Sequence, residues 1–172
     1  GRSCRHSRLV KDTLQRHIQL VENTDLLVVG TSHDMLPIDR RERFHLSGDA
    51  LERTGRLLSQ IWGIHEFAVL NTCNRIEVLA AAAVEAPVES LAAMILGFNA
   101  LSEDEFYIRR GEKAFEHLAL LCAGLLSQTP GESNIVSQIK DAVNTAVENE
   151  WAGGIMTEWL DFNERTEIML RS

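Results

Sequence analysis

Apolar residues form short runs in the first half of the chain and recur at helical spacing in the second half. The run Leu26–Gly30 predicts a buried strand that ends at its glycine. Phe67–Leu70 and Ile76–Ala83 predict two more strands, joined by the tight connection Asn71–Asn74. Strands that come first and helices that follow are typical of an α+β fold. We expect a small sheet with helices in the N-terminal half and helices alone in the C-terminal half.

Helices are also predicted between the strands. Pro37–Leu46 is charged and predicts a short helix, and Ser47 is expected to cap the next helix, Asp49–Trp62. Pro87–Phe98 predicts an apolar helix that ends near Gly97. One side of the helix after Ser47 carries the residues expected to face the core: Leu51, Thr54, Leu58 and Ile61.

The C-terminal half predicts three helices, over Lys113–Leu126, over Glu132–Glu150 and from Ile155 onward. Cys122 lies on the apolar stripe of the first and is expected in the core, whereas His117 lies beside that stripe and is expected to be structural. The stripes consist of Ala114, Phe115, Leu118, Cys122 and Leu125, and of Ile135, Val136, Ile139, Val143, Ala146 and Val147.

The length of 172 residues suits one main domain. We expect an N-terminal extension over 1–24, the domain over 25–154 and the start of a truncated long helix over 155–172. The net charge of −8 argues against DNA and against broad nucleic-acid binding, but it permits a small basic patch for one end of an RNA. No apolar run approaches the roughly 20 residues needed to cross a bilayer, so no membrane partner is expected.

Three cysteines, Cys4, Cys73 and Cys122, occur at no metal-binding spacing, and an odd number argues against a disulfide framework. No metal site is therefore expected. The composition suggests a reducing compartment, either the cytoplasm or an organelle stroma.

Cys73, Arg75 and Glu77 are spaced by two, so in an extended chain their side chains project to one side while Ile76 and Val78 face the core. A guanidinium beside a thiol favours the nucleophilic thiolate. Polar neighbours of Cys73 could bind an oxyanion or a substrate carbonyl, and one of them, Asn74, could also supply a positive φ in a sharp turn. These neighbours are Asn71, Thr72 and Asn74. The alternative is an inert small residue at a strand edge.

Three segments resemble, in the same order, motifs of the glutamyl-tRNA reductase family. The most specific is VLNTCNRIE over 69–77, which resembles the family's S-T-C-N-R-x-E signature. The other two are Gly30–His33 with Pro37 and Arg41–Arg43, similar to G-x-N-H-x-x-x-P…R-E-R, and Gly131–Ile135 with Gln138–Ala142, similar to G-E-P-Q-I-x-x-Q-V-K-x-A.

The resemblance implies a cysteine that attacks the ester joining glutamate to its tRNA. The resulting thioester is then reduced by NADPH to glutamate-1-semialdehyde, a tetrapyrrole precursor. By position, Cys73 would be the nucleophile, and Arg75 would hold a glutamate carboxylate or the RNA end. The other residues expected around the substrate on this resemblance are Thr72, Asn74, Glu77, His33, Glu132 and Arg109.

Several positions depart from the family pattern. Arg109 stands where the family usually has a histidine, so a general base is missing there, although a second cation could itself favour the thiolate. The remaining departures are Asp34-Met35, Ala123, Leu126 and Ser133-Asn134. The sequence contains no G-x-G-x-x-G between a strand and a helix, so we expect no cofactor on this chain and NADPH only from a separate or missing domain.

Three functions are compatible with these observations. The first is part of a working or naturally split reductase, in which glutamyl-tRNA and an NADPH domain are the partners. The second is a stand-alone domain that forms the thioester and passes the glutamyl group to an amine or to water. The third is a non-catalytic module that holds tRNA, haem or a partner reductase.

Overall fold

The computed structural model describes residues 23–124 and 134–171, with side chains up to Asn163. Four strands form one antiparallel sheet in the order β2-β3-β1-β4. The strands are β1 (Thr24–Ser32), β2 (Ile64–Asn71), β3 (Arg75–Ala83) and β4 (Tyr107–Arg110). The helices are α2 (Ile38–Arg41), α3 (Asp49–Ser59), α4 (Val88–Ile95), α5 (Glu112–Cys122), α6 (Ile135–Glu148) and α7 (Gly154–Arg171), with 3-10 turns at Glu42–Phe44 and Phe98–Ala100.

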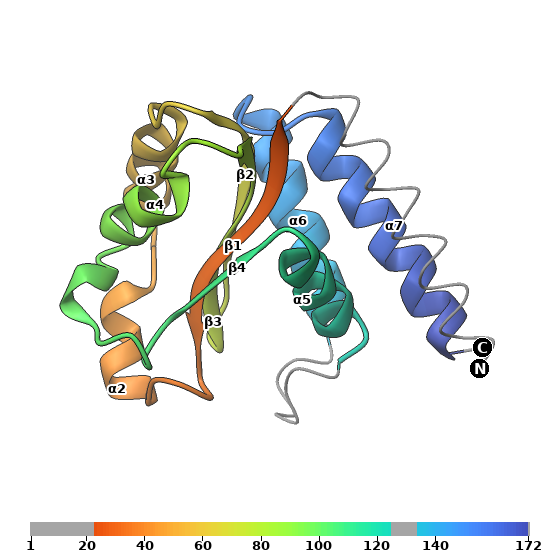
Figure 1. Cartoon of the computed structure of the whole chain (residues 1–172). Coiled ribbons are helices and arrows are strands. Elements are labelled where there is room, and N and C mark those ends of the chain that lie inside the picture. Colours follow the sequence, from red (N-terminus) through yellow and green to blue (C-terminus); the bar gives the residue numbers. More distant parts are fainter. Residues whose placement is uncertain (1–22, 125–133, 172) are drawn as a thin grey trace.

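Helices cover both faces of the sheet, as Figure 1 shows: α3 and α4 lie on one side, and α5, α6 and α7 on the other. Alternate residues of the central strands therefore enter two different cores. Val28 and Leu79 pack in the core under α5–α7, whereas Val29 and Val78 pack in the core under α3 and α4. The nearly continuous apolar run of β3 is typical of a strand buried on both faces.

The α+β prediction is confirmed, and most predicted elements are present. Thr54 and Leu58 are buried on α3 as expected, and Cys122 is buried in the core. α4 ends shortly before Gly97, whose φ of 89° is in the left-handed region that favours glycine.

Two local predictions were wrong. β1 does not end at Gly30 but continues to Ser32, because its ladder with β3 extends to the pair Ser32 and Arg75. The side chain of Ser47 does not cap α3. The N-cap is Gly48, which has a φ of 56°, a conformation that glycine adopts at little cost.

A carboxylate from the sheet caps the N-terminus of α7. Glu66 on β2 accepts backbone N–H bonds from Gly153 at 2.6 Å, from Met156 at 3.0 Å and from Ile155 at 3.1 Å. These donors have no partners inside the helix, and the helix dipole favours a negative charge beside them. Glu66 therefore fixes the start of α7 against the sheet.

We expect Glu66→Gln to lower the free energy of unfolding by about 1–2 kcal/mol, because the amide keeps only one acceptor oxygen and loses the charge. Urea denaturation measures this change. The neighbouring exposed residue provides the matched control, and His65→Gln should leave the stability nearly unchanged. Equal stability of the two variants would contradict the capping role.

Candidate functional site

Cys73 lies in the turn between β2 and β3 and is exposed to solvent. Thr72 closes this turn, because its Oγ1 accepts N–H bonds from Asn74 and Arg75, both at 3.2 Å, and its own N–H donates to the Arg75 carbonyl at 2.9 Å. Cys73 is thus presented by a turn and is not part of the strand. Only Arg75 and Glu77 lie on β3 itself, which corrects the prediction that all three residues are extended.

A buried arginine fixes the main chain at Cys73. Arg41 donates from Nε at 3.2 Å and from Nη2 at 3.0 Å to the Cys73 carbonyl oxygen, and from Nη1 at 2.8 Å to the Leu36 carbonyl oxygen. The planar guanidinium therefore joins the cysteine turn to the segment that leads into α2. Arg41 belongs to one of the three motifs noted in the sequence, and the structure gives that motif a positioning role.

Two neighbours of Cys73 differ from expectation. The side chain of Asn71 is engaged with the backbone N–H and carbonyl of Leu46, so this amide holds the chain before α3 and is not presented as an oxyanion donor. Positive φ values outside glycine occur, in the described part of the chain, at Asn23 and Glu150. Asn74 therefore does not supply the positive φ that we predicted.

Behind the turn, four side chains form a buried polar network centred on Glu77. Its Oε1 accepts hydrogen bonds from Nη1 of Arg75 at 2.9 Å and from the Tyr107 hydroxyl at 2.7 Å. Nε2 of His117 lies 2.9 Å from Oε1 and 3.0 Å from Oε2. Glu77 is fully buried, so the network joins β3, β4 and α5 beneath the surface.

Electrostatics keeps Glu77 ionised. Burial by itself raises the pKa of this carboxyl, but the contacts with His117, Arg75 and Tyr107 together outweigh burial and lower the pKa to about 2. The pKa of Tyr107 is raised well above its ordinary value, by burial and then by the charge of Glu77. The network therefore holds a carboxylate and a neutral phenol at neutral pH.

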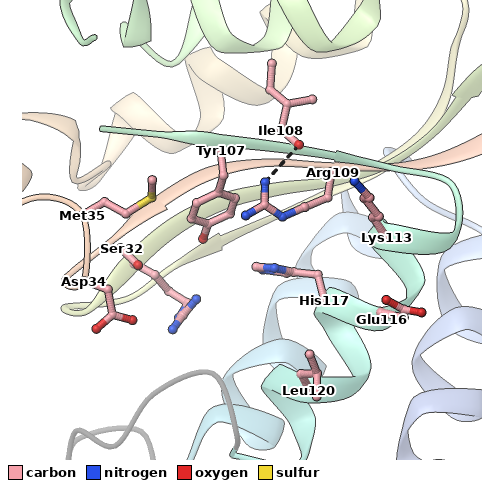
Figure 2. A pocket seen from close by; sticks show the side chains of 11 residues that line it. Ser32, Asp34, Met35, Tyr107, Ile108, Arg109, Lys113, Glu116, His117 and Leu120 are labelled. Atoms are coloured by element: carbon pink, nitrogen blue, oxygen red, sulfur yellow. Dashed lines mark hydrogen bonds between the residues drawn. The ribbon is translucent and has the colours of Figure 1, made fainter. Parts of the chain in front are cut away.

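Two cavities lie beside this network and share Arg75 as a wall. The large cavity is about 670 Å³, and in Figure 2 the side chains of Tyr107, Arg109 and His117 lie next to one another along it. The small cavity is about 210 Å³ and contains Cys73. The large cavity is lined by Ser32, Asp34, Met35, Arg75, Tyr107, Ile108, Arg109, Lys113, Glu116, His117 and Leu120, and the small one by Ile38, Arg41, Glu42, His45, Thr72, Cys73, Arg75 and Ile76.

Cations are concentrated at one part of the large cavity. The guanidinium of Arg109 stands 5.2 Å from the centre of the Tyr107 ring, a cation–π distance, and donates to the Ile108 carbonyl at 3.2 Å. Lys113 lines the same cavity from the first turn of α5. Arg109 differs in this respect from Arg110, whose guanidinium is engaged with Asp25 and Glu89.

The structure brings together some of the predicted site residues. Thr72, Cys73 and Arg75 line the small cavity, and Arg75 and Arg109 line the large one. Glu77 lies behind these walls and is wholly buried. The backbone N–H of His33 donates to the backbone carbonyl oxygen of Asn74 at 2.9 Å. The His33 ring lies 3.2 Å from Asp34 and belongs to neither wall. Glu132 lies outside the described residues.

Sequence reasoning missed Tyr107, Lys113 and His45 as cavity residues and took His117 as structural only. Tyr107 belongs to β4, a four-residue strand that the pattern did not predict. Among the described residues, no cluster of three or more His, Cys, Asp or Glu side chains could hold a metal ion. None of the described helices has the length and apolar character needed to cross a membrane.

The fold is an α+β domain, with a small antiparallel sheet between two helical layers. Its cysteine lies in a strand turn beside cavities that carry arginine and lysine side chains, an arrangement able to place an anionic substrate near a thiol. The family model for the N-terminal domain of glutamyl-tRNAGlu reductase matches residues 29–166, and the chain belongs to this family. The resemblance noted in the sequence motifs is thereby confirmed.

Individual relatives agree. The glutamyl-tRNA reductase of Brevibacillus brevis is 32% identical over 136 residues, which cover 76% of this chain and 30% of that protein. The glutamyl-tRNA reductase of Prochlorococcus marinus (strain NATL1A) is 32% identical over 157 residues, or 86% of this chain and 34% of that protein. The solved glutamyl-tRNA reductase from Methanopyrus kandleri has the same fold, with a TM-score of 0.62 at 23% identity over 82% of this chain and 34% of that one. The chain thus spans about a third of the length of these relatives.

Proposed function

We propose that this domain acts on glutamyl-tRNA and that the thiolate of Cys73 attacks the ester carbonyl, giving a glutamyl thioester and free tRNA. The observation that carries the proposal is the presentation of Cys73, which is exposed at a cavity wall while Arg41 and Thr72 fix its backbone. A thiol held in this way can approach an ester repeatedly in one orientation, as nucleophilic catalysis requires.

The two cavities suit two parts of the substrate. The glutamyl group lies against Arg75, whose guanidinium is fixed by Glu77 and is shared by both walls. The terminal nucleotide is larger than an amino acid and occupies the large cavity, where Arg109 and Lys113 supply positive charge for a phosphate. Thr72 and Asn74 act through the shape of the turn that presents Cys73.

In a complete reductase, NADPH supplies the hydride that reduces the thioester, and the product is used in tetrapyrrole biosynthesis. The residues of this chain do not fit that cofactor, because no glycine-rich G-x-G-x-x-G turn occurs anywhere in its 172 residues. The cofactor is assigned to a separate domain or partner, and the proposal for these residues ends at the thioester.

The decisive experiment is intact-mass measurement after the protein is mixed with glutamyl-tRNA. We expect wild type to gain one glutamyl group and Cys73→Ala to gain none, because the acceptor sulfur is gone. Cys122 is the matched control: it is buried in the core, so Cys122→Ala should still be loaded. Loading of Cys73→Ala would exclude Cys73 as the nucleophile. If wild type binds the tRNA but gains no glutamyl group, the result would instead favour a binding module.

A further inference from the structure

A further cavity, of about 240 Å³, lies against the outer edge of β2. β2 is an end strand of the sheet, so one side of its backbone pairs with β3 and the other side faces away from the sheet. The remaining walls come mainly from α3 and α6, which cover opposite faces of the sheet (Figure 1). The cavity is therefore a groove whose floor is a strand edge, and we call it the β2 groove.

The strand register determines which backbone groups of β2 face outward. At the hairpin, the N–H of Thr72 donates to the Arg75 carbonyl oxygen, so every second residue before Thr72 exchanges hydrogen bonds with β3. The N–H and C=O groups of the residues between them, Phe67 and Val69, point away from β3. Phe67 agrees with this assignment, because its N–H donates to the Trp151 carbonyl oxygen at 3.0 Å.

Val69 is the next outward position, and it lines the β2 groove. Its residue is only 6% exposed, yet within the described residues up to Asn163 its N–H forms no hydrogen bond. A backbone N–H that is buried in this way is costly unless it finds an acceptor. The groove thus contains a main-chain donor that is suited to a ligand with a carbonyl group.

The two edges of the sheet differ in how they are protected. β4, at the opposite edge, has four residues and carries Arg109 and Arg110, and short basic edge strands are a common protection against pairing with another chain. β2 has eight residues, and after Glu66 it continues through Phe67–Asn71 without a charged residue or a proline. The hydrogen bond from Trp151 covers the position of Phe67. The edge beyond that bond can still accept a partner strand.

An extended polypeptide is the ligand that suits this edge, because another main chain offers N–H and C=O groups at strand spacing. Alternate side chains of an added strand point to opposite faces of the sheet. Toward α6 they meet polar residues on one helix face, Gln138, Asp141 and Thr145, and toward α3 they meet Leu51. The exposed carboxylate of Asp141 favours a lysine or arginine, and Leu51 favours an apolar side chain.

A second copy of this domain suits the groove less well. Its own β2 edge lies between α3 and α6, and these helices would collide with the walls of the groove. Symmetric pairing of two β2 edges would also place both α6 helices, each with its Asp141 carboxylate, on the same face of the joined sheet. A single strand without flanking helices avoids both problems.

We propose that the β2 groove binds an extended segment of another protein, which adds a strand to the sheet. The N–H of Val69 donates to a carbonyl of this segment, and basic side chains toward α6 alternate with apolar side chains toward α3. The segment lies behind the turn of Cys73, because Thr72 lines both the groove and the small cavity. The inference does not depend on the chemistry proposed for Cys73.

The first test selects short peptides from a displayed random library on the wild-type protein and measures their binding by fluorescence anisotropy. We expect the selected peptides to alternate basic and apolar residues. Asp141→Lys should weaken their binding by about 10- to 100-fold, because like charges then face each other across the interface. Glu148→Lys is the matched control, since this acid is also exposed on α6 but does not line the groove. It should bind the peptides almost as wild type does.

The second test changes the peptide and leaves the protein as it is. N-methylation removes one backbone donor at a time, and in an added strand only every second N–H faces β2. Binding should therefore be lost at alternate positions of the peptide and kept at the positions between them. Hydrogen exchange followed by NMR should show the Val69 amide slowed in the complex, whereas the Phe67 amide, already bonded to Trp151, should change little.

Several results would overturn the proposal. One is a library that yields no binder, and another is a set of peptides that bind Asp141→Lys as tightly as wild type. Uniform tolerance of N-methylation would show that the groove takes a side chain only and adds no strand. Dimerisation of wild type that protects the Val69 amide without any peptide would assign the edge to a second copy.

Discussion

Glu77→Gln is expected to lower the free energy of unfolding by about 3–5 kcal/mol at neutral pH, the range found when one partner of a buried ion pair is removed. The amide that replaces the carboxylate keeps one acceptor and gains two donors. It then faces three donors, from Arg75, Tyr107 and His117, in a place with no exposure to water. Arg75 would keep its charge in the buried site without the carboxylate that compensates it.

The size of this effect should depend on pH. The pKa of Glu77 is about 2 in the folded protein and 4.5 ordinarily, so its ionisation stabilises the fold fully above about pH 4.5 and less and less as the pH falls toward 2. This shift corresponds to roughly 3 kcal/mol. Urea denaturation of wild type and Glu77→Gln between pH 7 and pH 3 should therefore show the two stabilities converging in acid.

Glu105 provides the control for this experiment. The pKa of its carboxyl is also lowered to about 2, first through a hydrogen bond with Arg40, but this ion pair lies at the surface, where Arg40 is exposed and Glu105 is only partly buried. Surface ion pairs contribute little to stability, so Glu105→Gln should change it only slightly at any pH. A difference in unfolding free energy between wild type and Glu77→Gln that stays constant from pH 7 to pH 3 would show that Glu77 is not held ionised by its neighbours.

The central strands could be predicted because they are short apolar runs, and most helices because their apolar residues recur at helical spacing. β4 could not, since it has four residues, YIRR, and two of them are arginines. It forms by pairing with β1, through partners such as Gly30 with Tyr107 and Val28 with Arg109. Such a strand depends on contacts distant in sequence, which a local pattern does not reveal.

At the site, the sequence indicated the cysteine and arginine but not their surroundings. Ile76 and Val78 face a core as predicted, yet the opposite face of β3 is covered as well, and Arg75 and Glu77 are buried there. The signal for this was the apolar run that follows Glu77 on β3, since a strand apolar on both sides is covered on both sides. The partner of Glu77, His117, is 40 residues away in the sequence, and only the packing of α5 on the sheet brings them together.

Gly30→Ala is the second change for which we expect a large effect, a loss of at least about 3 kcal/mol of unfolding free energy, toward the upper end for a single substitution. Gly30 sits in β1 between Glu77 and Tyr107. A Cβ atom there would lie 2.6 Å from Cγ of Glu77 and 2.7 Å from the carbonyl oxygen of Ile76. The second of these is backbone in the centre of the sheet, so relief requires the strands to separate or Glu77 to move.

Either response weakens the polar network, because the carboxylate of Glu77 reaches Tyr107 across the space above Gly30. Gly154→Ala is the matched control: nothing lies within 4 Å of its added Cβ, and alanine suits the first turn of α7, so stability should stay equal or rise slightly. Thermal and urea unfolding measure both variants. If Gly30→Ala were as stable as wild type, the sheet would have to accommodate a methyl group between β1 and β3, and the close approach that positions Glu77 for His117 would not be needed. A loss confined to Gly30→Ala would instead show that this glycine allows the fold to hold a charged carboxylate behind the cysteine turn.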